Sequence, residues 1–438
     1  MTQNYNKYDL ELLTPEAVPA PSPLAVRVVS STKGFDDLGE VWKDLHNEAG
    51  LWVFQSFEWL RAWWRQFGES NPSATLHILV CTSAEETIAI APLFVERVFV
   101  LGIPVFHRLR FIGCETSDYL DILVKTGWER QCAEVIASYC FANRNLFQVV
   151  QFEDSPDRSR VHRLLYEALA AAGFRGQRFI NDACPRTELR STWEATMELI
   201  PGDHRRELKR RRRLLTERHQ VQYEISPPES ALSDLVEFIG MHQRRWESVG
   251  QRGLFADPRV VRFQKEVASQ FARRGWLVLS FLRVDGKRVA VNYGFQFKDE
   301  LSHYLNGVED AGEARKYSPG AVLHAYCMEE MIRRGARAYD FLRGTEPYKY
   351  ELGAVDVPNW SMIMHNDEAS LIVVRLRVAV LTRALLRRLA REWGIWNHQR
   401  RIHGFFSRKL MQSSRKSIQS VVADGLQKAQ APDKPIGL

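Results

Sequence analysis

The same order of predicted elements occurs twice along this chain of 438 residues. In the first half, a helical pattern at 54–68 precedes two alternating strands within 76–98. In the second half, a helical pattern at 258–274 precedes two strands within 276–297, joined by an Asp-Gly turn. A repeat of this size predicts duplication of one α/β unit. Because a helix followed by a hairpin is a common arrangement, chance similarity is the alternative.

The chain is long enough for two such units and tails. We therefore expect an α/β (α+β) protein made of two tandem modules with mixed central sheets, at 25–190 and 191–366. A basic amphipathic helical segment is predicted at 367–412. The composition of residues 1–24 and 413–438 predicts a disordered lead-in and a disordered tail.

The composition, with 45% hydrophobic and 26% charged residues, is that of a globular protein. The sequence has neither a long apolar stretch nor the pattern of a secretory signal, so we expect a cytoplasmic protein. Six scattered cysteines without metal-ligand spacing predict reduced thiols and no metal site.

The net charge of +7 is concentrated in two segments. The first, at 204–213, reads HRRELKRRRR and predicts a solvated helix face, or a contact with cofactor phosphates, an anionic acceptor or tRNA. The second lies within 371–411 and mixes Arg with apolar residues. We favour a helical appendage there, with peripheral contact at the inner face of a membrane as the alternative.

The helix predicted after the third strand of the second half has a start suited to phosphate. Ser318 is expected to be its N-cap, Pro319 occupies its first turn, and Gly320 leaves backbone amides uncovered. Such a start offers free N–H groups and a positive dipole end to a pyrophosphate. Arg315 and Lys316 could add charge-assisted contacts. The alternative is a well-capped helix that only packs on the sheet.

The next predicted strand, at 338–343, and its following loop carry several functional groups. Asp340 lies in an apolar strand, where a carboxylate needs a partner such as Lys349 or Arg343. Glu346, Tyr348 and Lys349 cluster beyond the carboxyl end of the strand, the usual place for ligands in an open α/β sheet.

Two further groups are candidates for binding an acceptor. Asp118, Tyr119 and Asp121 precede and enter an apolar stretch, where Asp121 needs a partner. Asp121 is expected to face a cleft between the modules or to form a salt-bridged turn. Arg245 and Trp246 belong to a predicted helix, and an ordinary helix surface is the alternative for them.

Several segments of the chain resemble those of a known family. The segment from His303 to Ala354 resembles the acyltransferase domain of the CelD-type, BioF2-like branch of the GNAT superfamily. Supporting pieces are FQSFEWLRAWW, SDYLDILV, RRELKRRRRLL and HQRRWES. The resemblance covers roughly 26–366, and members are similar to Fem-type transferases in having two fused GNAT-like modules.

The resemblance implies that acetyl-CoA or another acyl-CoA binds where two central strands splay apart, as a co-substrate without a metal. Its pyrophosphate would meet the helix start at Arg315, Lys316, Tyr317, Ser318, Pro319, Gly320 and Ala321. The superfamily pattern has more glycines there than this chain retains.

Acyl transfer needs a base, a hydrogen-bond donor to the carbonyl and an acid for the leaving thiolate. Asp340 and Glu346 are candidate bases, and Tyr348 is a candidate acid. Lys349 could hold a carboxylate, orient an acidic sugar or pair with phosphate.

The expected function is acyl-CoA-dependent N- or O-acyl transfer, with acetyl as the default group. From the resemblance, the acceptor is a sugar or a cell-envelope or exopolysaccharide (cellulose-type) precursor, and nucleic acid is not an expected partner. One alternative is a Fem-like transferase that moves an aminoacyl group from tRNA to a peptidoglycan precursor. The other is a non-catalytic scaffold in polysaccharide biosynthesis.

Overall fold

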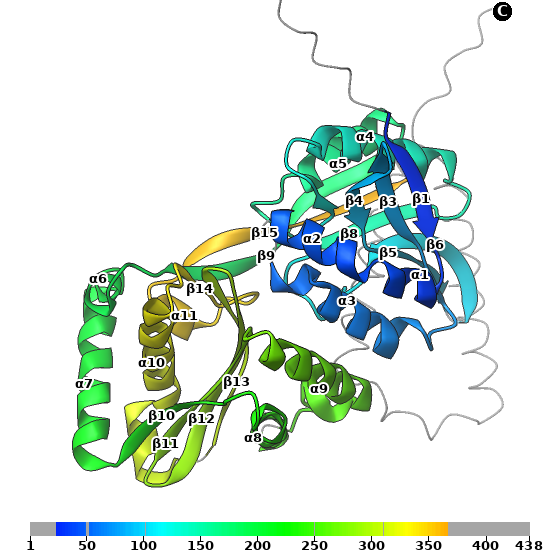
Figure 1. Ribbon diagram of the computed structural model, residues 1–438. Helices are drawn as coiled ribbons and strands as arrows, with labels where there is room; N and C mark the ends of the chain where they lie inside the picture. The colour runs from blue at the N-terminus through cyan, green and yellow to red at the C-terminus, as the bar shows by residue number, and fades with distance from the viewer. Residues whose placement is uncertain (1–22, 50–51, 101, 249, 310, 367–438) are drawn as a thin grey trace, which may run out of the picture.

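The computed structural model describes residues 23–366 apart from 50–51, 101, 249 and 310 (Figure 1). The predictions for 1–22 and for 367–438 lie outside the described residues. The described chain is an α/β protein with one sheet of four strands and one of eleven.

The helices and strands follow one another in two series. The first module contains β1 (Ala25–Val29), α1 (Thr32–Asp37), α2 (Gly39–Ala49), η1 (Val53–Gln55), α3 (Phe57–Trp63), η2 (Trp64–Gly68), β2 (Ala74–Leu76), β3 (Ile78–Ser83), β4 (Glu86–Ala91), β5 (Leu93–Val100), β6 (Ile103–Phe111), β7 (Leu123–Val124), α4 (Glu129–Ala142), β8 (Val149–Pro156), α5 (His162–Ala171) and β9 (Arg175–Glu188). The second module contains α6 (Trp193–Met197), α7 (Gly202–Arg218), β10 (Val221–Ile225), α8 (Ala231–Ser248), η3 (Leu254–Ala256), α9 (Pro258–Arg273), β11 (Leu277–Val284), β12 (Lys287–Phe297), β13 (Glu300–Val308), η4 (Gly312–Tyr317), α10 (Pro319–Arg333), β14 (Ala338–Asp340), α11 (Pro347–Glu351) and β15 (Val355–His365).

The hairpins of the predicted repeat are confirmed. β3 pairs with β4 in the first module, and β11 pairs with β12 in the second, both antiparallel. Each module also contains one parallel pair, β6 with β8 and β13 with β14. In the second module, α8 and α9 cover one face of the sheet, and α7 and α10 cover the other (Figure 1).

The two modules share one continuous sheet. β15 lies between β8 and β9 and pairs antiparallel with both, although β15 is the last element of the second module in sequence. The end of β9 pairs in turn with β14. The strand order is therefore β10-β11-β12-β13-β14-β9-β15-β8-β6-β5-β2, and Figure 1 shows β9 and β15 running from one module into the other.

The hydrophobic core also joins the modules. Trp59 of α3 packs edge-to-face on Phe263 of α9, with ring centroids 4.9 Å apart, and also contacts Phe295 and Tyr304. Burying such aromatic surface is a major stabilising contribution. The first module therefore packs directly against the sheet and helices of the second module.

The apolar stretch that Asp121 enters contains only a short strand, and the strand predicted at 338–343 is shorter than expected. Only Leu123–Val124 of the stretch 119–124 is a strand, because residues before it form a loop whose Leu120 N–H bonds to the Asp154 carbonyl. The strand predicted at 338–343 ends at Asp340, because Leu342 adopts a left-handed backbone with φ of 56°.

Candidate functional site

The site is built where β13 and β14 separate. Their parallel pairing ends at Ser302 and Asp340, yet β13 continues to Val308 while the chain after Asp340 turns away. Tyr304 is an extra residue in β13 relative to β12, a bulge that bends the strand at this point. Separation of two parallel strands leaves backbone groups of β13 facing an opening rather than a partner.

A cavity of about 500 Å³ lies at this opening, a size typical of small-molecule sites. Both modules contribute to it. Its walls come from the first-module loop, α8, η3, α9, β13 and the turn after β14: Glu115, Thr116, Asp118, His242, Arg245, Trp246, Leu254, Val260, Gln264, His303, Tyr304, Leu305, Asn306, Phe341, Leu342, Arg343, Glu346, Tyr348 and Lys349.

Asp340 holds the turn after β14 together. Its side chain is buried, one oxygen accepting the Leu342 N–H at 2.7 Å and the other accepting the Tyr119 hydroxyl at 2.7 Å. Burial raises the pKa of Asp340 to about 7. The expected pairing of Asp340 with Lys349 or Arg343 is wrong. The chain turns at Leu342, which has a left-handed backbone, and beyond this turn both cations bind other groups.

Lys349 closes the same turn from the opposite side. Its ammonium donates to the carbonyls of Leu342, Arg343 and Gly344 at 3.3, 3.0 and 3.0 Å. It also pairs with Glu346 at 2.9 Å, although Lys349 is 3% exposed and Glu346 is 57% exposed. Lys349 thus satisfies a buried charge through main-chain acceptors, whereas Glu346 stands at the rim of the cavity.

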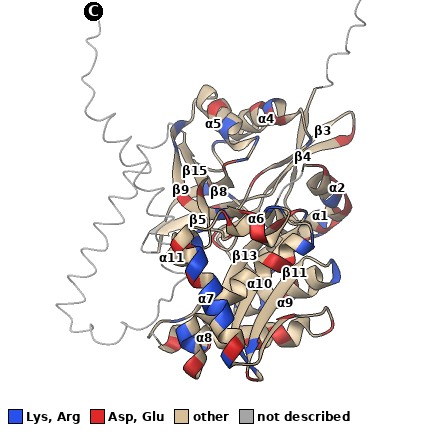
Figure 2. Ribbon diagram, turned by 90° about the vertical axis from the view of Figure 1, so that its left-hand side faces the viewer, with Lys and Arg blue, Asp and Glu red and all other residues tan. Residues whose placement is uncertain are grey.

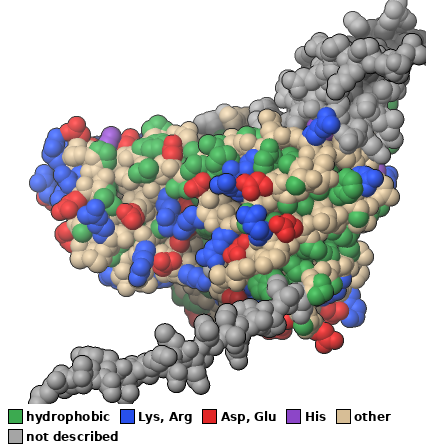
Figure 3. Space-filling view, turned by 90° about the horizontal axis from the view of Figure 1, so that it is seen from above, with side chains coloured by type: hydrophobic (Ala, Val, Ile, Leu, Met, Phe, Trp, Pro, Cys, Tyr) green, Lys and Arg blue, Asp and Glu red, His purple; other side chains and the backbone are tan. Residues whose placement is uncertain are grey.

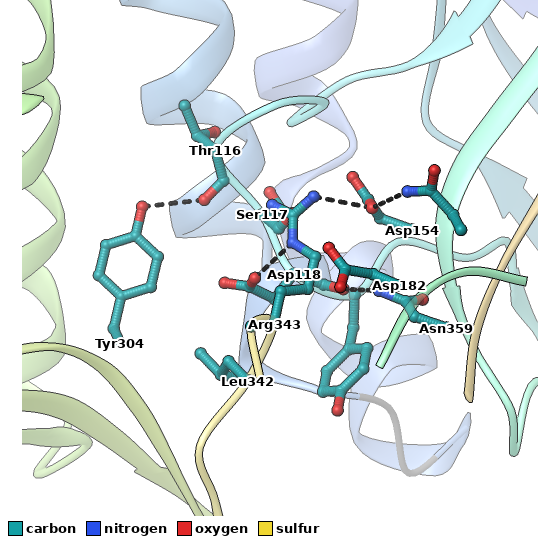
Figure 4. Close-up of polar contacts among 12 residues, drawn as sticks. Thr116, Ser117, Asp118, Asp154, Asp182, Tyr304, Leu342, Arg343 and Asn359 are labelled. Carbon is teal, nitrogen blue, oxygen red and sulfur yellow. Dashed lines mark hydrogen bonds and ion pairs between the residues drawn. The ribbon is translucent and has the colours of Figure 1, made fainter. Parts of the chain in front are cut away.

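Arg343 binds the turn to the first module (Figure 4). Its guanidinium pairs with Asp118 at 2.6 Å and Asp154 at 2.8 Å, and donates to the Ser117 carbonyl at 3.0 Å. In addition, the Tyr304 hydroxyl donates to the Thr116 carbonyl at 2.9 Å. These buried, charge-assisted contacts fix the loop 113–121 over the opening between β13 and β14.

Neutral aromatic and imidazole rings form the floor beneath the cavity. His324 of α10 bonds to the Tyr339 hydroxyl at 2.9 Å and stacks on Tyr348 with centroids 5.4 Å apart. Burial lowers the pKa of His324 to about 3 and lowers that of His303 as well. Burial raises the pKa of Tyr348, so its phenol keeps its proton at neutral pH and can donate a hydrogen bond.

The predicted phosphate-binding helix start lies at the carboxyl end of β13. A Cβ on Gly320 would be 3.4 Å from Val308 at the end of that strand, and Pro319 is the first helical residue as predicted. The expected capping bond from the Ser318 side chain is wrong: Ser318 has φ of 50°, and side-chain capping requires an extended residue there. Lys316 pairs with Glu313 at 2.8 Å.

Three more predicted cofactor residues lie on the same segment, η4 and the start of α10. Tyr317 is buried against Leu215 of α7, while Arg315 is exposed and Ala321 is partly buried. The structure thus keeps the seven predicted cofactor residues at one end of the sheet.

The basic helix α7 lies beside this helix start. It contacts η4 and α10, and Arg212 fastens it through an ion pair to Glu329 at 2.9 Å and through the Tyr326 ring at 4.1 Å. Residues 202–218 contain eight Lys or Arg residues and only three Asp or Glu residues. The outward side is strongly cationic (Figures 2 and 3), with Arg206 and Arg213 mostly exposed.

The predicted acceptor residues fall into separate places. Asp118, Arg245 and Trp246 line the large cavity, and Tyr119 lies behind it against Asp340. Asp121 instead lines a second cavity of about 220 Å³ between the modules. Its carboxylate is buried, accepts the Ile122 N–H at 2.9 Å, and has its pKa raised to about 7 by burial.

Sequence reasoning missed Glu115, which reaches the large cavity from a buried ion cluster under the first-module loop. The cluster contains Arg108 and Arg110 of β6. Two arginines at alternate positions of an otherwise apolar strand must share one face. That pattern was the available signal that buried carboxylates lie nearby.

Within the described residues, no cluster of His, Cys, Asp and Glu could hold a metal ion.

Comparison with known proteins identifies a domain within the second module. Residues 202–350 match the family model described as an acetyltransferase (GNAT) domain. The second module is therefore a GNAT domain, and the chain is an acyltransferase. The fold of the described chain as a whole resembles that of FemX.

Several solved structures are similar to the chain at low sequence identity. A crystal structure of FemX has 10% identity and a TM-score of 0.54, covering 77% of this chain and 96% of that one. L-PGS from Bacillus licheniformis has 14% identity and a TM-score of 0.46, with coverages of 78% and 96%. A tandem GNAT protein from the clavulanic acid biosynthesis pathway has 13% identity and a TM-score of 0.41, with coverages of 77% and 98%. No curated protein matches the sequence.

Proposed function

We propose that this chain transfers an acyl group, acetyl by default, from acyl-CoA to a nitrogen or oxygen of a sugar or of a cell-envelope or exopolysaccharide (cellulose-type) precursor. The observation that carries the proposal is the separation of β13 from β14 beside a cavity of about 500 Å³. The start of α10 lies at the same end of the sheet.

The residues present fit an acyl-CoA in chemical terms. Backbone groups of β13 beyond Ser302 can hydrogen-bond the amides of a pantetheine arm. The first turn of α10 at Pro319–Ala321 offers a positive dipole end to the pyrophosphate, with Arg315 and Lys316 beside it. When bound, acyl-CoA would supply the activated carbonyl for transfer.

The residues of the turn divide into two kinds of role. Tyr348 lines the cavity with a protonated phenol and is our candidate for protonating the leaving thiolate. The side chains of Asp340 and Lys349 form hydrogen bonds with the backbone of the turn itself. These bonds support a positioning role for both residues. Glu346 remains a candidate base at the rim.

The walls of the cavity support a sugar acceptor. Trp246 and Tyr304 offer aromatic faces, while Asp118, Arg245 and Asn306 offer charged or amide groups. Aromatic surface with a few polar groups suits a ring that is apolar on its faces and hydroxylated at its edge. A scaffold without catalysis is less well supported, because the cavity beside the strand opening is not filled by side chains.

Acetyl-CoA binding to purified protein, followed by calorimetry, tests the donor. Gly320→Asp should weaken binding at least about tenfold, because a carboxylate would face the pyrophosphate. Gly202→Asp is the matched control, since it places the same charge at the start of α7, where acids stabilise a helix. The proposal fails if wild-type protein neither binds acetyl-CoA nor releases thiol with any of a panel of amino sugars.

A second candidate is transfer of an aminoacyl group from tRNA to a peptidoglycan precursor. The cationic side of α7 and the shared fold with FemX favour it. Reversing three charges, Arg206→Glu, Arg210→Glu and Arg213→Glu, should then reduce tRNA affinity and flatten its dependence on salt concentration. If the triple variant binds tRNA as the wild type does, without dependence on salt concentration, and still binds acetyl-CoA, the second candidate is excluded and the first stands.

No helix of the described residues is long and apolar enough to cross a membrane. A cytoplasmic location is part of the proposal, with peripheral contact between 371–411 and the inner face of a membrane as the alternative to a helical appendage there.

A further inference from the structure

A buried ion cluster lies under the loop 113–121. Glu96 of β5 bonds to Arg108 at 2.7 Å and to Arg110 at 3.2 Å. Arg110 also bonds to Glu115 at 3.1 Å and to Glu153 of β8 at 2.8 Å. Charged side chains of β5, β6 and β8 thus form one network with Glu115 of the loop.

The cluster has one more carboxylate than it has arginines. Burial disfavours the charged form of a carboxylate, and these three carboxylates share two arginines. One of the three is therefore protonated more readily than the other two. Arg110 and Arg108 keep the pKa of Glu96 and of Glu153 below their usual range, despite the opposing effect of burial. For Glu115, burial and the charges of Glu153 and Glu96 raise the pKa.

Two other groups face this cluster. Burial raises the pKa of the Cys114 thiol well above its usual value, so the thiol stays neutral. Arg259 of α9 reaches a small adjoining cavity of about 80 Å³ but is paired with Asp257 at 2.7 Å. Neither group adds a further cation, so Glu115 shares Arg110 with Glu96 and Glu153.

Glu115 connects the cluster with the large cavity. It lines both the 500 Å³ cavity and the 80 Å³ cavity beside Arg110, so its side chain stands between the two. Its backbone has φ of 71°, a left-handed conformation that costs energy for a residue other than glycine. The neighbouring Thr116 and Ser117 hold it there through Tyr304 and Arg343.

The other carboxylates in or beside the cavity are engaged in contacts of their own. Asp118 is held by the Arg343 guanidinium at 2.6 Å, and Glu346 is exposed and held by Lys349. Asp340 uses both oxygens as acceptors of bonds from Tyr119 and Leu342 and does not line the cavity.

We propose that Glu115 of the first module is the general base that accepts the proton of the acceptor in the site of the second module. This rests on the proposed function. The acceptor nitrogen or oxygen forms a bond to the thioester carbonyl carbon, the carbon–sulfur bond breaks, and the proton moves to the Glu115 carboxylate. The departing thiolate takes up a proton from the Tyr348 hydroxyl. Glu115 then releases its proton to solvent and Tyr348 regains one from solvent, so acyl-CoA and acceptor give acylated acceptor and free CoA thiol.

Labelling with dicyclohexylcarbodiimide tests the proton site without any substrate, because this apolar reagent modifies protonated carboxyl groups. Peptide mass spectrometry of the full chain should find Glu115 modified in preference to Glu96 and Glu153, and less at pH 8 than at pH 6. Glu153→Gln balances the charges of the cluster, so labelling of Glu115 at pH 6 should fall. Labelling of Glu96 or Glu153 instead, or none of Glu115, overturns the inference.

Thiol release from acetyl-CoA with an amino-sugar panel tests the catalytic role. Glu115→Gln should lower kcat by about 100-fold or more with little change in KM, and should remove the acid limb of the pH profile. Glu115→Ala should be partly rescued by formate, which a structural role would not allow. In Glu153→Gln the acid limb should persist and shift to lower pH.

An unchanged kcat in Glu115→Gln, with thiol release by the wild type, overturns the assignment of the base while sparing the proposed function. Absence of thiol release by wild-type protein overturns both the proposed function and the catalytic role of Glu115. The labelling experiment needs no substrate, so its result still tests whether Glu115 holds a proton.

Discussion

Four residues other than glycine take a left-handed backbone around the site: Glu115, Asp154, Ser318 and Leu342. Each such residue costs on the order of 1–3 kcal/mol and persists only where its surroundings fix it. Leu342 is held by Asp340, and Asp154 is held by Arg343, so the ion pairs and the strained residues depend on one another. Sequence reasoning identified Asp340 as a carboxylate that needs a partner. It could not identify Tyr119, because the two lie 221 residues apart.

Asp121 gives a pH-dependent prediction at the scale of one residue. Its pKa is about 7 in the folded chain and near 4 when unfolded, so the folded chain binds more protons between these pH values. The contribution of Asp121 to stability is therefore fully present below about pH 4 and is lost as the pH rises towards 7, by up to about 4 kcal/mol. Asp121→Asn removes this loss.

Urea unfolding should accordingly find Asp121→Asn more stable than the wild type at pH 8 and no more stable at pH 4. Asp340 contributes in the same direction, so some pH dependence should remain in the variant. Equal effects at both pH values would contradict the prediction.

At the scale of elements, local patterns predict what local forces determine. The hairpin β11–β12 and the helices α9 and α10 follow from alternation, helical periodicity and an Asp-Gly turn. The position of α7 does not follow from its composition. Leu208, Leu215 and Arg212 turn one side of α7 towards the core and α10, and only the assembled fold shows that its cationic side flanks a candidate phosphate site.

At the scale of the molecule, the repeat predicts two modules but not their exchange of strands. β15 inserts between β8 and β9, and such pairing over long sequence separations leaves no local signal. The division at 190/191 thus follows the sequence, while the sheet and the core extend across it. We expect one cooperative unfolding transition for both modules.

Gly176 tests this cooperativity. A Cβ there would lie 2.0 Å from the Ile363 carbonyl oxygen, so Gly176→Ala forces β9 and β15 apart. Thermal unfolding followed by calorimetry should show the whole transition at a lower temperature, with a loss of about 2–4 kcal/mol. Gly286→Ala, at a positive φ of 80° but with open space around it, should cost only about 1 kcal/mol. Two separate transitions in Gly176→Ala would show that the modules fold independently.

The loop 113–121 belongs to one copy of the duplicated unit and completes the cavity of the other. The copies can therefore no longer be inherited or exchanged separately: a hybrid that receives the second module from a relative must receive this loop with it. Substitutions at three positions, Glu115, Thr116 and Asp118, can change the lining of the cavity while leaving every residue of the matched GNAT domain unchanged.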